Sequence, residues 1–78
     1  MLLLKLYADS GEKVVYNYFP EGKDPSGMIS IDKESGDIEI NKIADNDSHS
    51  IYLHHAVSRV SVYQKEKKYL ETDTVAWC

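Results

Sequence analysis

The chain of 78 residues is poor in the features that mark exported, membrane or disulfide-rich proteins. Its one cysteine, Cys78, has no intramolecular partner, which is typical of a protein kept in a reducing cytoplasm. The apolar start at residues 1–4 is interrupted by Lys5, so it lacks the long apolar region of a secretion signal. No segment approaches the roughly 20 consecutive apolar residues of a membrane span. The sequence therefore predicts a cytoplasmic protein without a membrane segment.

Positive charge is also scarce, since nine basic residues stand against 13 acidic residues and the formal net charge is −4. Such a balance repels a phosphate backbone and disfavours nucleic acid as a partner. The cluster of Lys65, Lys67 and Lys68 is the local exception, although Glu66 and Glu71 interleave with it. Cations at the end of a helix match the negative end of its dipole. Weak nucleic-acid binding through the Lys65 to Lys68 cluster is kept as an alternative.

Residues 28–43 give the clearest structural signal, that of a β-hairpin. Isoleucines alternate with polar residues before and after a turn in which Asp32 can bond the backbone and Gly36 can adopt positive φ. If Asp32 faces Asp37, isoleucines oppose one another across the hairpin and form one apolar patch, which we expect to lie under a helix. The members of that patch are Ile29, Ile31, Ile38 and Ile40.

The rest of the chain predicts three further strands and one helix. Residues 2–8, 13–19 and 73–77 have the alternation or the β-branched and aromatic content of strands, and both prolines lie in the loop at residues 20–27. Residues 48–67 carry apolar side chains at helical spacing, after Asn46 or Asp47 as the N-cap. The prediction is a single α+β domain, residues 1–78, built as an antiparallel β-meander of four to five strands with one helix packed on one face.

Motifs of known chemistry are absent from the sequence. His49, His54 and His55 would project in diverging directions from one helix, and neither the H-E-x-x-H pattern nor paired cysteines are present. Ser58 and Arg59 are the polar neighbours one turn further on. We therefore expect no catalytic residue, no metal, no cofactor and no small-molecule substrate. A small hydrolase or metal-dependent enzyme using the helix histidines is the alternative.

Surplus apolar side chains favour a protein contact instead. Ile51 and Val62, with His55 between them, occupy the side of the predicted helix away from Leu53 and Val60. Both faces of the second strand are largely apolar, so one of them can be left exposed. The leading hypothesis is a non-enzymatic protein-interaction module that acts as a homodimer. The residues assigned to its interface are Val14, Tyr16, Tyr18, Ile51, His55 and Val62.

Four segments also carry a resemblance over nearly the whole chain. They are V-V-Y-N-Y-F-P-E-G-K, the hairpin S-I-D-K-E-S-G-D-I, H-A-V-S-R-V and the closing V-A-W. The chain resembles small uncharacterised bacterial proteins of about this length. The resemblance implies a single domain, and it carries over no activity, ligand or catalytic residue.

Overall fold

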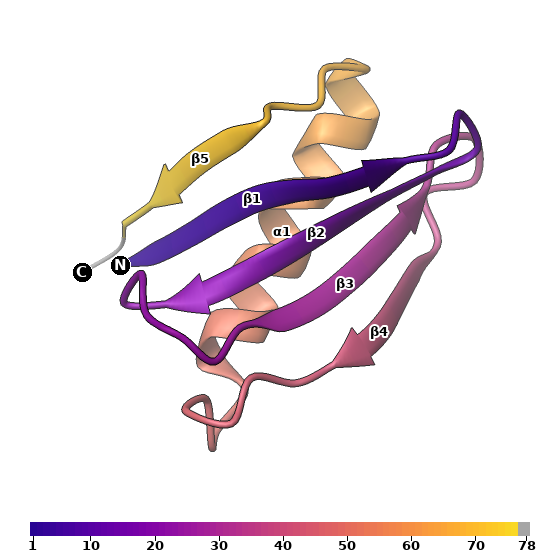
Figure 1. Cartoon of the computed structure of the whole chain (residues 1–78). Coiled ribbons are helices and arrows are strands. Elements are labelled where there is room, and N and C mark those ends of the chain that lie inside the picture. Colours follow the sequence, from indigo (N-terminus) through magenta and orange to yellow (C-terminus); the bar gives the residue numbers. More distant parts are fainter. Residues whose placement is uncertain (77–78) are drawn as a thin grey trace.

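The strands and the helix form where the sequence pattern predicts them (Figure 1). The computed structural model describes residues 1–76. Each predicted element is present, with its ends shifted by a few residues. The predicted final strand was extended to Trp77, which lies outside the described residues, as does Cys78. The elements are β1 (Leu2–Asp9), β2 (Lys13–Pro20), β3 (Gly27–Asp32), β4 (Ile38–Lys42), α1 (Ile51–Glu66) and β5 (Thr72–Val75).

The strands form one antiparallel sheet in the order β4-β3-β2-β1-β5. The first four strands follow one another as a meander, and β5 returns after the helix to pair with β1, with Leu2 opposite Val75. The helix crosses behind the strands in Figure 1 and packs against β1, β2 and β3. The predicted α+β fold, with one helix on one face of the sheet, is thus confirmed.

A single core lies between the helix and the sheet. Because side chains alternate along a strand, one face of β1 to β3 contributes Leu4, Ile29 and Ile31, which are almost completely buried. Ala56 and Val60 of α1 close over them and are also fully buried. Each large side chain removed from water in this way contributes on the order of 1.5–3 kcal/mol.

Three of the predicted interface residues belong to this core, so that part of the prediction is wrong. Val14, Tyr16 and Tyr18 are between 0% and 1% exposed, and the helix covers them. The Tyr18 ring lies against the backbone of Gly27, where an added Cβ would come within 2.1 Å of the ring. Its hydroxyl accepts a hydrogen bond from the Ala44 N–H at 2.8 Å. The face of β2 that stays open is the alternate one, which carries Val15 and Phe19.

The hairpin has the predicted register, but the helix covers its isoleucine patch only in part. Ile31 pairs with Ile38 and Ile29 with Ile40, and the Asp32 carboxylate accepts bonds from the backbone of the turn, as its place in the sequence predicts. Ile38 is half-buried, however, and Ile40 is 51% exposed. The reason is geometric, because β4 lies at the edge of the sheet, beyond the strands against which α1 packs.

The start of the helix depends on Asp47, one of the two predicted capping residues. The helix begins at Ile51 after Ser50, which has a left-handed backbone and no capping bond from its side chain. The buried carboxylate of Asp47 instead accepts hydrogen bonds from the N–H groups of Tyr52 and Leu53, at 3.2 and 2.9 Å. These groups lack partners inside the helix, so Asp47 satisfies donors that would otherwise lose hydrogen bonds on burial.

Candidate interaction surfaces

The three histidines do not come together at a site. His49 and His54 are exposed, and His55 is half-buried beside a groove of about 300 Å³. Among residues 1–76, no three histidine, cysteine or acidic side chains lie close enough to hold a metal ion. The groove is lined by His55, Ser58, Arg59, Val62 and Val75, between the helix and the β5 edge of the sheet.

Arg59, the charged residue that lines the groove, forms an ion pair within the fold. Arg59 lies 3.3 Å from the Asp73 carboxylate, which also accepts a hydrogen bond from the Tyr63 hydroxyl. Burial, and then this bond, raise the pKa of Tyr63 well above its ordinary range. The neighbouring Tyr16 donates to the carbonyl of Leu70 at 2.6 Å, and burial raises its pKa to about 12. The hydroxyls of Tyr63 and Tyr16 thus hold β5 and the segment before it against the rest of the fold.

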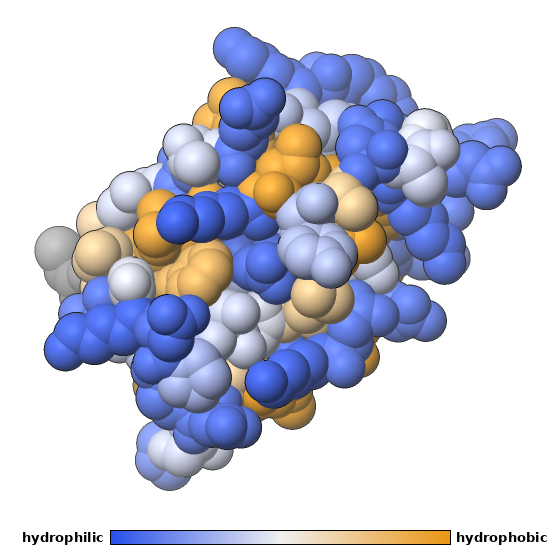
Figure 2. Space-filling model, viewed as in Figure 1, coloured by the Kyte–Doolittle hydropathy of each residue, from blue (hydrophilic) through white to orange (hydrophobic). Residues whose placement is uncertain are grey.

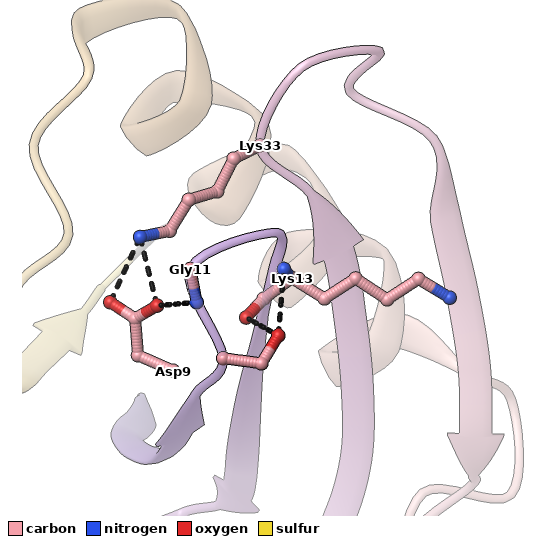
Figure 3. A network of polar contacts seen from close by, with 5 residues as sticks. Asp9, Gly11, Lys13 and Lys33 are labelled. Carbon is pink, nitrogen blue, oxygen red and sulfur yellow. Dashed lines mark hydrogen bonds and ion pairs between the residues drawn. The ribbon is translucent and has the colours of Figure 1, made fainter.

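A second polar cluster lies where the β1–β2 turn meets the tip of the hairpin (Figure 3). Lys33 lies 2.8 Å from the Asp9 carboxylate, which also accepts the Gly11 N–H at 2.9 Å. The bond from Lys33 is the main cause that lowers the pKa of Asp9. Lys33 also lies 5.3 Å from the centre of the Tyr69 ring. The Lys33 ammonium and the Asp9 carboxylate thus form an ion pair that links the two turns. A shallow hollow of about 370 Å³ lies beside this pair.

The face of the sheet opposite the helix is uncovered and mixed in character. Figure 2 shows this face with apolar groups lying among hydrophilic ones. Its half-buried apolar side chains are Leu3, Val15, Phe19 and Met28, and the Lys5 ammonium lies 5.4 Å from the centre of the Phe19 ring. The sequence pattern had indicated Val14, Tyr16 and Tyr18 for the open face of β2, but these residues lie in the core.

Other apolar side chains are exposed at the edge of the sheet and on the helix. Ile51 and Val62 are 48% and 44% exposed, in agreement with their predicted position away from the core. At the β4 edge, Ile40 and Ile43 are 51% and 48% exposed. Among the described residues, the other exposed large apolar side chains are Met1 and Tyr7.

The lysine cluster follows the end of the helix. Lys65, Lys67 and Lys68 are exposed, and Lys67 caps the helix with a left-handed backbone whose N–H bonds the Gln64 carbonyl. Its ammonium donates to the carbonyl of Lys33 at 3.3 Å. Part of the cluster therefore holds the helix end to the hairpin.

Comparisons with family models, curated proteins and solved structures find no match for this chain. No helix among residues 1–76 is both long and apolar enough to cross a membrane.

Proposed function

We propose that the protein is a non-enzymatic protein-interaction module that acts as a homodimer. The observation that carries the proposal is the exposure of four β-branched side chains, Ile40, Ile43, Ile51 and Val62, each between 44% and 51% exposed. Isolated exposed apolar residues are ordinary, but pairs on one edge and on one helix face favour a contact with another protein surface.

The size of the chain supports association with a second copy. A domain of 78 residues buries only about 60–65% of the surface that its unfolded chain exposes. Covering further apolar surface by dimerisation adds stability that the small core does not supply.

Light scattering coupled to size-exclusion chromatography tests the proposal across a range of protein concentrations. We expect a mass that rises toward twice 8.9 kDa as the concentration increases into the micromolar range. A mass that stays at the monomer value at every concentration would contradict self-association.

A further inference from the structure

The outer side of β4 combines exposed apolar side chains with a free sheet edge. Within the described chain, β4 has a neighbouring strand on one side only, so its other side presents backbone donors and acceptors. Ile38 and Ile40 lie on the helix side of this strand; Ile38 packs in part against the core, and Ile40 is 51% exposed. A strand added at this edge would satisfy the backbone groups and cover the isoleucines together.

The two edges of the sheet differ in how they are protected. β5 is four residues long, and its Asp73 points to the helix side, where it is held by Arg59 and Tyr63. A charged side chain directed inward and a short length both discourage pairing with another strand. β4 is also short and carries charges, but its Glu39 and Lys42 point away from the helix side and it has no proline, so β4 is the less protected of the two edges.

The irregularity in β4 makes this edge complementary to itself. Ile29 pairs with Ile40 and Met28 with Lys42, so the strand contains one extra residue at Asn41. Glu39 and Lys42 consequently lie on the same face of the sheet, opposite to the helix. An antiparallel pairing of two copies, centred between residues 40 and 41, sets Glu39 of each copy opposite Lys42 of the other.

We propose that a second copy of this chain pairs its β4 antiparallel with β4 about a two-fold axis, joining two five-stranded sheets into one. This inference rests on the proposed homodimer and names its interface. Two symmetric Glu39–Lys42 pairs set the register on one face. On the other face, Ile38 and Ile40 of both copies lie along the joined edge.

Charge reversal tests the register without disturbing the core, because Glu39 and Lys42 are exposed. Each single variant, Glu39→Lys or Lys42→Glu, places like charges opposite each other twice and is expected to raise the dimer Kd by about tenfold. The double variant restores the pairs and is expected to return the Kd to within about threefold of the original.

Two control variants separate charge from other effects of the substitutions. Glu39 accepts a bond from the Asn41 side chain at 3.1 Å, so Glu39→Gln keeps an acceptor while removing the charge and should give an intermediate Kd. Glu66→Lys, at the end of the helix, changes the net charge equally and should leave the Kd unchanged.

Cysteine cross-linking in a Cys78→Ser background locates the interface directly. In the proposed register the two copies of residue 41 lie diagonally across the axis, within the Cα separation that a disulfide accepts. Asn41→Cys is expected to form a covalent dimer on oxidation, whereas Thr74→Cys, on the β5 edge, is not. A dimer that is unaffected by both single charge reversals, or that cross-links through residue 74 alone, overturns the β4 interface and leaves the proposed homodimer standing. A strictly monomeric protein overturns both.

Discussion

Removal of the Asp47 carboxylate should destabilise the domain strongly, because this side chain holds the start of the helix. The side chain is 4% exposed and accepts two backbone hydrogen bonds, from Tyr52 and Leu53. Asp47→Ala removes the acceptor of both hydrogen bonds, one of which, to Leu53, is buried. Loss of a capping residue typically costs up to about 2 kcal/mol, and burial places this one at the upper end.

A loss of about 2 kcal/mol is large for this protein, whose expected stability is on the order of 4–12 kcal/mol. It corresponds to a fall in Tm of roughly 8–16 °C for a domain of this length, measured by circular dichroism during heating. Asp47→Asn keeps one acceptor oxygen, so it should lose about half as much. Asp45→Ala removes an exposed carboxylate two residues earlier and should change the stability by less than about 0.5 kcal/mol. Equal Tm values for Asp47→Ala and Asp45→Ala would refute the assigned role.

Three further predictions concern packing and pH. Gly27→Ala should destabilise the domain by about 1–3 kcal/mol in urea unfolding, because its Cβ would meet the fully buried Tyr18 ring; unchanged stability would contradict that contact. Burial raises the pKa of Tyr16 from 10.0 to about 12, so its contribution to the free energy of unfolding is complete below pH 10 and is lost as the pH rises through 12. The urea midpoint of unfolding should therefore fall over that pH range, and it should fall less in Tyr16→Phe. Backbone N–H groups of Ser35 and Glu34 lower the pKa of Asp32 from 3.8, so its contribution to the free energy of unfolding is present above that pH and is lost as the pH falls below it. In Asp32→Asn the free energy of unfolding should therefore depend less on pH in the acid range.

The hairpin was predictable because its signals are local. Alternation of isoleucine with polar residues determines which residues share a face, and Asp32 and Gly36 determine where the chain turns. Together they give the observed register, with Ile31 opposite Ile38. The predicted N-cap, Asn46 or Asp47, was wrong in position, since the N-cap is Ser50, but Asp47 still accepts hydrogen bonds from the first turn of the helix.

The orientation of β2 was not predictable because the deciding contacts come from distant parts of the chain. Both of its faces are rich in apolar side chains, so alternation alone does not rank them. The tyrosine hydroxyls decide the matter, since a buried hydroxyl needs a partner. Tyr16 finds the Leu70 carbonyl, 54 residues away, and Tyr18 finds the Ala44 N–H, 26 residues away. Only the folded chain brings these groups together.

The open face of the sheet explains why the proposed contact lies at an edge rather than on that face. Lys5 pairs with Thr72 on one side and with Asn17 on the other, so a polar row crosses three adjacent strands. This row separates Leu3 and Phe19 from Val15 and interrupts the apolar surface. A partner laid on the face would have to desolvate the ammonium of Lys5 and the amide of Asn17, a cost that offsets the apolar area gained. At β4 a second strand satisfies the backbone groups while it covers the isoleucines, and the exposed charges there, Glu39 and Lys42, meet charges of opposite sign, which offsets part of the cost of their desolvation.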